Sequence, residues 1–171
     1  IDPAEIGKNV GTNIPIVGDI KTTLRELLKK DIDRNDWGWL SKVEKWKKVR
    51  LGVGECNDGL NPMEGIEALA AQAPKDAILV TDVGQHQIWA GRYYPVEQPR
   101  TFLTSGGLGT MGYGLPAAIG AKLGQPDKQV MLITGDGSLQ MNLAELATMV
   151  QEKAAVKILL FIDQRVGSLH D

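Results

Sequence analysis

The sequence predicts an α/β fold in which a parallel sheet is flanked by helices and is preceded by the end of a second α/β domain. From residue 61 onward, short apolar runs alternate with amphipathic segments, which is the pattern of parallel strands joined by helical crossovers. The run Val130–Ile133 is apolar at every position, as in a parallel strand covered on both faces. Three strand exits carry polar or glycine-rich turns, where parallel sheets bind ligands; they are residues 82–86, 106–112 and 135–138.

The composition of the 171-residue chain excludes several classes of protein. Its hydrophobic content of 43% and charged content of 23% are typical of a globular protein. A net charge of −2 argues against a nucleic-acid partner, and no apolar run is long enough to cross a membrane. The single cysteine, Cys56, excludes an internal disulfide framework and fits a reducing compartment, so we expect a cytoplasmic protein. Because the chain begins at Ile1 in the middle of a pattern, we expect it to be a piece of a longer protein.

Residues 1–30 are expected to form the last strand and helix of the earlier α/β domain. The apolar segment Ile14–Val17 predicts a short strand, and Asp19 is placed to cap the helix that follows. One face of that helix is apolar; it contains Ile20, Leu24, Leu27 and Leu28.

Residues 31–60 are expected to form a polar linker with one short helix. Ser41 and Glu44 have the spacing of a capping box for a helix that ends near Val49. Basic residues around it are interleaved with acids, which indicates a solvated face. The tryptophans of this segment are interpreted as packing anchors rather than a binding site; they are Trp37, Trp39 and Trp46.

Residues 61–171 are expected to form the second domain, incomplete at its C-terminus. Asn61 followed by Pro62 predicts a helix start, and Ser138 is expected to open a later helix whose apolar face continues to Val150. The predicted strands are 77–81, 101–105, the run 130–133 and 156–162, with further helices around Trp89 and from Gly112 to Leu123.

The turn after the third strand carries the residues on which we expect the chemistry to depend. Gly135 and Gly137 flank Asp136, and a strand, a glycine turn and a helix N-terminus together favour a bound anion. A carboxylate beside a phosphate needs a cation between them, and Mg²⁺ is the usual one. Asp163 ends the next strand, 27 positions after Asp136, so both acids are expected at one sheet edge. The alternative is that both aspartates are only turn and capping residues.

The glycine turn at 106–112 supports a second hypothesis. Gly107, Gly109 and Gly112 satisfy the dinucleotide-binding pattern G-x-G-x-x-G, and Asp136 follows 24 residues after the last of them. A nicotinamide- or flavin-nucleotide module is therefore the alternative. It is less favoured because a ribose-binding acid gives no reason for Asp163.

The turn at 82–86 is a further candidate for phosphate binding. Gln85 and His86 follow a strand directly, and both can donate hydrogen bonds to a phosphate oxygen. A lone histidine is more often a surface or core residue, so a structural role is the alternative. We favour a ligand role because of the position in a strand-exit turn.

Three motifs extend well beyond these turns. They are Asp82–Trp89, Thr104–Gly120 and the turn Gly135–Ser138 with Asp163 at a metal-ligand position. Together they resemble the catalytic subunit of the acetohydroxyacid synthase (acetolactate synthase) family of thiamine-diphosphate-dependent enzymes. The segments Ile1–Lys8 and Ile14–Asp19 resemble the end of that family's flavin-binding middle domain. The resemblance covers most of the chain apart from the linker.

The resemblance implies a thiamine-diphosphate-binding fold, of which this chain carries the diphosphate domain. It assigns no catalytic side chain, because the chemistry is the cofactor's own. The residues that would hold thiamine diphosphate are Val83, Gly84, Gln85, His86, Gly109, Met111, Gly137 and Ser138. Those that would hold Mg²⁺ are Asp136, Asp163 and the backbone carbonyl of Arg165. Contacts with FAD would fall on Asp19, together with Ile1, Asp2 and Ile20.

The activity implied is that of a transferase in branched-chain amino acid biosynthesis, which decarboxylates pyruvate and condenses it with a second 2-oxo acid. In the family a glutamate of a pyrimidine-binding domain activates the cofactor, and these residues do not include that domain, so we expect this chain alone to be inactive. The full-length protein is expected to be a homodimer or homotetramer, with a regulatory subunit as a further partner.

The end of the chain matches the family pattern least well. Ile162-Asp163 stands where the family has paired asparagines, and Ser168 stands where it has a methionine near the substrate. Another thiamine-diphosphate decarboxylase remains an alternative because substrate choice in the family lies largely in segments outside these residues, and a non-catalytic module that binds Mg-diphosphate is a second alternative.

Overall fold

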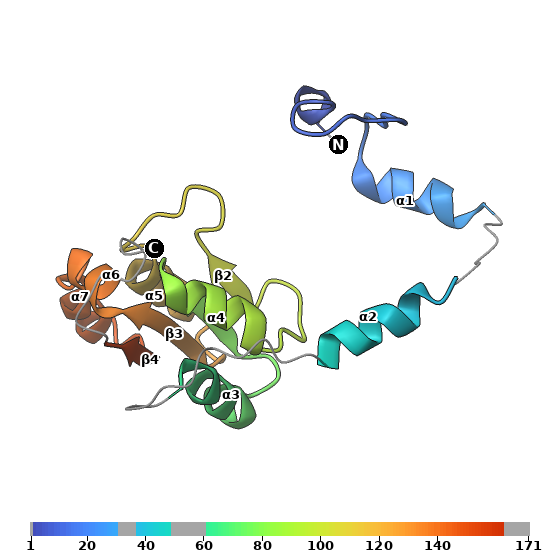
Figure 1. Ribbon diagram of the computed structural model, residues 1–171. Coiled ribbons are helices and arrows are strands. Elements are labelled where there is room, and N and C mark those ends of the chain that lie inside the picture. Colours follow the sequence, from blue (N-terminus) through green and yellow to red (C-terminus); the bar gives the residue numbers. More distant parts are fainter. Residues whose placement is uncertain (1, 31–36, 49–60, 163–171) are drawn as a thin grey trace. The chain divides into compact units, whose positions relative to one another are not determined.

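The computed structural model describes residues 2–30, 37–48 and 61–162, and the chain divides into two compact units, 1–51 and 52–171. The first unit contains the short 3-10 helix η1 (Pro3–Glu5) and the helices α1 (Ile20–Leu28) and α2 (Trp39–Lys48) (Figure 1). The division falls inside the predicted linker. No helix of the described ranges is both long and apolar enough to cross a membrane.

Helix α1 forms as predicted, but the strand before it does not. The Asp19 carboxylate caps the helix by accepting a hydrogen bond of 2.8 Å from the Thr22 backbone N–H. Residues 14–17 have irregular backbone instead of the predicted strand. Within the described residues no strand pairs with them, and a lone strand leaves its N–H and C=O groups without a ladder.

Helix α2 begins at Trp39, so the predicted capping box at Ser41 is wrong. Ser41 lies inside the first turn of the helix rather than in front of it. The rings of Trp39 and Trp46 lie edge to face, with centroids 5.4 Å apart, because residues seven apart share one helix face. The two tryptophans contact each other, yet each is more than half exposed.

The second unit is built on a four-stranded parallel sheet with the order β2-β1-β3-β4, which confirms the predicted α/β fold. The strands are β1 (Ile78–Thr81), β2 (Phe102–Thr104), β3 (Val130–Gly135) and β4 (Val156–Phe161). Because β1 lies between β2 and β3, the chain crosses to one side after β1 and to the other side after β2. The carboxyl ends of β1 and β3 therefore form a topological switch point.

Helices cover both faces of this sheet, and alternate strand residues face them (Figure 1). On one face Ile78 and Val80 pack with Leu132 under helix α5 (Gly114–Gly124). On the other face Leu79 and Met131 pack under helices α3 (Pro62–Gln72) and α4 (Gln85–Tyr93). All five strand side chains are at least 95% buried, as expected for strands covered on both sides.

The helix predicted from Ser138 to Val150 is two helices. Strand β3 runs directly into α6 (Asp136–Met141), and α7 (Glu145–Gln151) follows after a break. Across the break the backbone N–H of Asn142 bonds to Leu139, three residues back instead of four. The Asn142 side chain also donates to the Gly112 carbonyl, which ties the break to another loop.

Candidate functional site

Three turns meet at the switch point of the sheet, at the carboxyl ends of β1, β3 and β2. Hydrogen bonds join them directly: Ser138 Oγ donates to the Val83 carbonyl at 2.8 Å, and the Gly112 N–H donates to Asp82 Oδ1 at 2.9 Å. The structure thus brings together the turns 82–86, 105–113 and 135–138, which are far apart in sequence. Every residue proposed to hold thiamine diphosphate lies on one of them.

The turn at 82–86 is shaped by glycine. Gly84 has φ +152°, and a Cβ added there would lie 2.7 Å from His86 Cε1. Both the backbone angle and the close approach of the imidazole exclude a larger residue. Helix α4 starts immediately afterwards at Gln85, with Val83 and Gln85 half-buried beside it.

His86 is buried beneath the turn after β3. Its imidazole lies so close to Gly135 that a Cβ there would be 3.1 Å from Nδ1. Burial lowers the pKa of His86 below its usual 6.5, and the Asp82 carboxylate, a hydrogen bond to the Asp82 backbone and the Asp136 carboxylate only partly offset this. The imidazole is therefore neutral at pH 7. Its Nε2 has no hydrogen-bond partner in the part of the chain that the structure describes, which is costly for a buried nitrogen.

The turn after β3 places Asp136 as the first residue of α6. Its Oδ1 accepts a hydrogen bond of 2.8 Å from the Gly137 N–H. Ser138 is buried and its hydroxyl is engaged with Val83, although an oxygen that donates can still accept. Because α6 has only six residues, its dipole is weaker than that of the long helix expected from the sequence.

The glycine loop between β2 and α5 covers the same site. Gly109 and Gly112 both have positive φ, of +68° and +85°. Gly109 is exposed, whereas Met111 is half-buried and its methyl carbon would lie 3.7 Å from a Cβ on Gly137. Met111 is therefore placed against the turn after β3, with an apolar surface toward it.

This geometry does not match a dinucleotide-binding turn. In such folds the glycine pattern follows the central first strand in a tight turn to a helix. Here Gly107, Gly109 and Gly112 follow β2, which pairs only with β1 among the described strands, and nine residues separate β2 from α5. The central strand β1 instead carries the turn with His86.

Comparison with known proteins identifies the family. Residues 82–170, which are 89 of the 171 residues, match the family described as "Thiamine pyrophosphate enzyme, C-terminal TPP binding domain". The chain belongs to the thiamine pyrophosphate enzymes. The chain is also similar to proteins named acetolactate synthase large subunit, with 45% identity to that of Lactococcus lactis subsp. lactis (strain IL1403) and 46% to that of Cyanidium caldarium. These matches cover 98% of this chain but 29% and 30% of the relatives, so the chain spans about three tenths of their length.

The site suits the cofactor of the thiamine pyrophosphate enzymes. A diphosphate offers acceptor oxygens to the unpartnered Nε2 of His86, which can donate once the ring is protonated, a form that the negative charge of the diphosphate favours. The glycines at 84 and 137 let a ligand approach the backbone closely. The apolar Met111 offers a surface suited to an aromatic ring.

Of the three residues predicted to bind Mg²⁺, two lie outside the described ranges. Asp136 is described, whereas Asp163 and Arg165 are not. Within the described ranges no group of three or more acidic, histidine or cysteine side chains is arranged for a metal. A Mg²⁺ ion that keeps several waters and binds phosphates needs few protein ligands.

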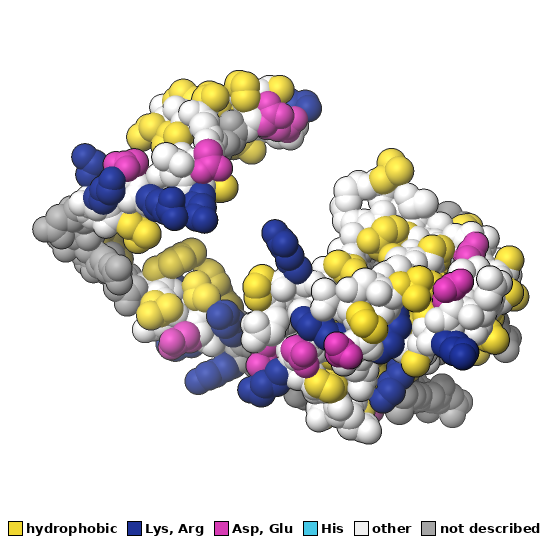
Figure 2. Space-filling model, turned by 180° about the vertical axis from the view of Figure 1, so that it is seen from behind, with side chains coloured by type: hydrophobic (Ala, Val, Ile, Leu, Met, Phe, Trp, Pro, Cys, Tyr) yellow, Lys and Arg dark blue, Asp and Glu magenta, His cyan; other side chains and the backbone are white. Residues whose placement is uncertain are grey.

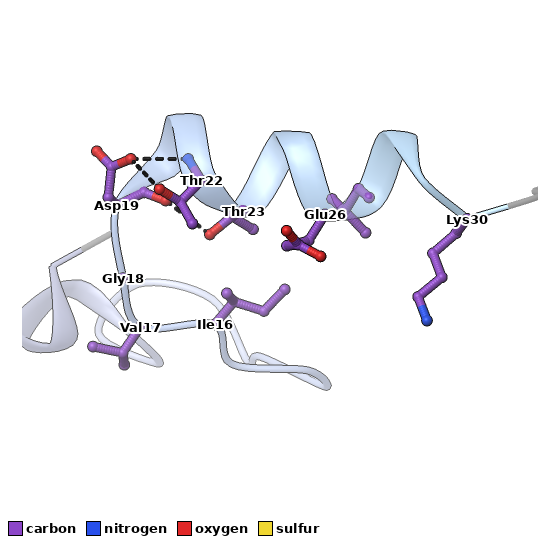
Figure 3. Close-up of a pocket in the computed structure, with 9 residues that line it drawn as sticks. Ile16, Val17, Gly18, Asp19, Thr22, Thr23, Glu26 and Lys30 are labelled. Carbon is purple, nitrogen blue, oxygen red and sulfur yellow. Dashed lines mark hydrogen bonds between the residues drawn. The ribbon is translucent and has the colours of Figure 1, made fainter.

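Asp19, the predicted flavin contact, lies in the first unit and belongs to a separate candidate site. It lines a cavity of about 380 Å³. Figure 3 shows its carboxylate held by Thr22, whose backbone N–H and hydroxyl donate to Oδ1 at 2.8 and 2.9 Å. These hydrogen bonds lower the pKa of Asp19 and keep it ionised. Of the other flavin candidates, Asp2 caps η1, Ile20 begins α1, and Ile1 is outside the described residues.

The sequence reading assigned no role to three polar residues at this site. Asp82 is 1% exposed and accepts hydrogen bonds from the N–H groups of Val83, Gly112 and Gly114. Asn142 holds the Gly112 carbonyl, and Gln87 donates to Thr104 Oγ1 at 2.8 Å. The sequence contains one signal for a functional role of Asp82: it is an acid directly after a central strand, as Asp136 is.

Proposed function

We propose that this chain forms the diphosphate-binding half of the cofactor site of an acetolactate synthase. One observation carries the proposal: three turns meet at the switch point around His86, whose buried Nε2 has no partner among the described residues. The chain also belongs to the thiamine pyrophosphate enzymes. The names of the similar proteins support this substrate class. The proposed reaction is decarboxylation of pyruvate followed by condensation with a second 2-oxo acid, in branched-chain amino acid biosynthesis.

The residues of this chain would bind and orient the cofactor. His86 and Gln85 would donate hydrogen bonds to the diphosphate, and the backbone at Gly84 and Gly137 would allow its close approach. Met111 and Gly109 would lie against the aminopyrimidine. When bound, thiamine diphosphate supplies a nucleophilic carbon that adds to the carbonyl of a 2-oxo acid and takes up the electron pair left when carbon dioxide departs.

Magnesium would join the carboxylates to the diphosphate. Asp136 is the described ligand in this proposal, with Asp163 and the Arg165 carbonyl as the others. Two negative groups, a carboxylate and a diphosphate, attract a divalent cation between them and repel each other without it. Cofactor and metal should therefore bind together.

The remaining features of the proposal concern the whole protein. FAD would contact Asp19 in the first unit, where the carboxylate already caps a helix that faces a cavity. The full-length enzyme would act in the cytoplasm as a homodimer or homotetramer, with a regulatory subunit as a further partner.

Titration calorimetry tests the proposed function. Thiamine diphosphate is titrated into the purified chain with Mg²⁺ and again with EDTA in excess. Binding that requires Mg²⁺ is the expected result, and equal affinity in both conditions would remove the metal bridge. Binding of NADH without binding of thiamine diphosphate would favour the dinucleotide alternative, and Mg-dependent binding of pyrophosphate but not of the whole cofactor would favour a simple diphosphate module.

A further inference from the structure

The Asp82 carboxylate connects the turn 82–86, which it opens at the end of β1, with the glycine loop that follows β2. Its own backbone N–H continues the ladder to β3 by donating to the Ile133 carbonyl at 2.9 Å. The residue is therefore fixed to the rigid centre of the sheet. Only 1% of it is exposed, so its carboxylate is shielded from water and depends on protein donors.

Those donors are backbone N–H groups of the two neighbouring loops. Asp82 Oδ1 accepts from Val83 at 2.8 Å and from Gly112 at 2.9 Å, and Oδ2 accepts from Gly114 at 2.9 Å. Gly114 is the first residue of α5, whose own preceding residue, Tyr113, makes no capping bond with its side chain. Asp82 thus caps α5 from a distant part of the chain, with a charge that suits a helix N-terminus.

The close fit at this point requires glycine. A Cβ on Gly114 would lie 2.8 Å from Asp82 Oδ2 and 2.8 Å from Leu132 Cδ1. A Cβ on Gly112 would lie 2.8 Å from Asn142 Nδ2, which donates to the Gly112 carbonyl. The loop is therefore held from both sides, by Asp82 and by Asn142.

We propose that Asp82 is a positioning residue that fixes the glycine loop carrying Gly109 and Met111 relative to the turn carrying Val83–His86. The inference rests on the proposed function, because those two segments would hold opposite ends of thiamine diphosphate. A ligand that spans both segments needs them at a fixed separation, whereas a ligand that contacts only one does not. Asp82 itself would touch neither end of the cofactor.

The test uses Asp82→Asn, which keeps the shape but replaces one acceptor oxygen with an NH₂ group that faces a backbone N–H. Binding of Mg²⁺ with thiamine diphosphate and binding of Mg²⁺ with inorganic pyrophosphate are measured for variant and wild type. We expect the affinity for thiamine diphosphate to fall about 10- to 100-fold, as for loss of hydrogen bonds to a buried charge. The affinity for pyrophosphate should change by less than about twofold, because pyrophosphate does not reach the glycine loop.

Hydrogen exchange provides a readout that needs no cofactor. In the wild type the amides of Gly112 and Gly114 should be protected, and in Asp82→Asn both should exchange faster. The matched control is Ile119→Val, which removes one methylene from a buried side chain of α5 itself and should lower the melting temperature without changing the ratio of the two affinities or the protection of Gly112 and Gly114 relative to the rest of the sheet domain. If Asp82→Asn does not fold, Asn142→Ala is used instead, because it loosens the same loop from its other side. Its affinity for thiamine diphosphate should also fall more than its affinity for pyrophosphate, but by a smaller factor than in Asp82→Asn.

Parallel losses of both affinities in Asp82→Asn would overturn the inference, since general destabilisation lowers both. Unchanged exchange at Gly112 and Gly114 would overturn it as well. If the wild type bound no thiamine diphosphate, the proposed function would fail, while the exchange measurement would still decide whether Asp82 holds the loop.

Discussion

Asp136 is the residue at which the metal hypothesis is most directly testable. Its carboxylate follows β3 at the switch point and already holds the Gly137 N–H at 2.8 Å. Asp136→Ala removes an oxygen ligand, so Mg-dependent binding of thiamine diphosphate should weaken by at least about 100-fold, the upper range for loss of even an indirect metal partner. Calorimetry with and without Mg²⁺ measures the change.

Asp163→Asn is the comparison for this variant. Asparagine keeps a carbonyl oxygen and matches the residue type of the family at that position, so its effect should be mild. If Asp163→Asn abolished binding as completely as Asp136→Ala, the charge of Asp163 would be essential, and its assignment as an exchangeable oxygen ligand would be wrong.

His86 makes the stability of the second unit depend on pH. Its pKa is lowered in the folded chain by burial, so the unfolded chain binds its proton more readily below pH 6.5. The free energy of unfolding therefore contains a contribution from the neutral imidazole above pH 6.5. This contribution is lost as the pH falls from 6.5 toward the lowered pKa of His86 in the folded chain. Melting temperatures should drop between about pH 7.5 and 5.5, and the drop should be smaller in His86→Gln.

The carboxylates near His86 are present in both proteins, so they do not account for a difference between them. An identical pH dependence in wild type and His86→Gln would show that the imidazole is not shielded as the structure has it.

At the scale of the elements, the two glycines proposed to lie beside the cofactor should differ in their response to alanine. Gly84→Ala places a Cβ 2.7 Å from the His86 ring at φ +152°, and should destabilise the chain by about 1–3 kcal/mol. Gly137→Ala meets only Met111 at 3.7 Å and lies in α6, so stability should change by less than about 1 kcal/mol. Its added methyl should nevertheless reduce cofactor binding. Denaturant unfolding and calorimetry separate the two effects, and equal destabilisation would contradict the described turn.

The strands and most helix starts could be predicted from the sequence because their causes are local. The buried strands carry unbroken apolar runs, and the caps at Asp19 and Asn61 need only nearby backbone. The prediction of a strand at 14–17 was wrong because a strand also needs a partner strand, which the local sequence does not specify. The break after α6 was missed because it involves Asn142 and a carbonyl 30 residues away.

The candidate site could be predicted in part for the same reason. Turns that follow parallel strands meet at one edge, so His86 and Asp136 could be placed together before the structure was known. Asp82 could not be given a role, because its importance comes from the donors that fold back onto it. Asp163 and Arg165 stay predictions, since they lie outside the described residues.

At the scale of the whole molecule, the chain by itself should not turn over pyruvate. Thiamine diphosphate must lose a proton to become nucleophilic, and a general acid–base group has to lie within about 2.6–3.2 Å of its target. The three turns contain no glutamate, and Glu64 and Glu145 lie on α3 and α7 instead. An acetolactate assay with saturating Mg²⁺, thiamine diphosphate and FAD should therefore show no turnover.

A rate of about 1 s⁻¹ or more, ordinary for an enzyme, would show that the activating acid is within these residues. The Asp136→Ala variant serves as the background for that assay. Activity that appeared only after addition of a second polypeptide would agree with a site completed from elsewhere.

The exposed apolar stripe of the first unit has a consequence for handling the protein in solution. Ile14, Ile20 and Leu28 are 60% or more exposed, and Figure 2 shows hydrophobic side chains along the surface of this unit. A net charge of −2 supplies little long-range repulsion between copies, and added salt screens what there is. This apolar surface should therefore promote association between copies of the chain: we expect dilute, low-salt and mildly alkaline buffers to keep it dispersed and concentrated salt to precipitate it.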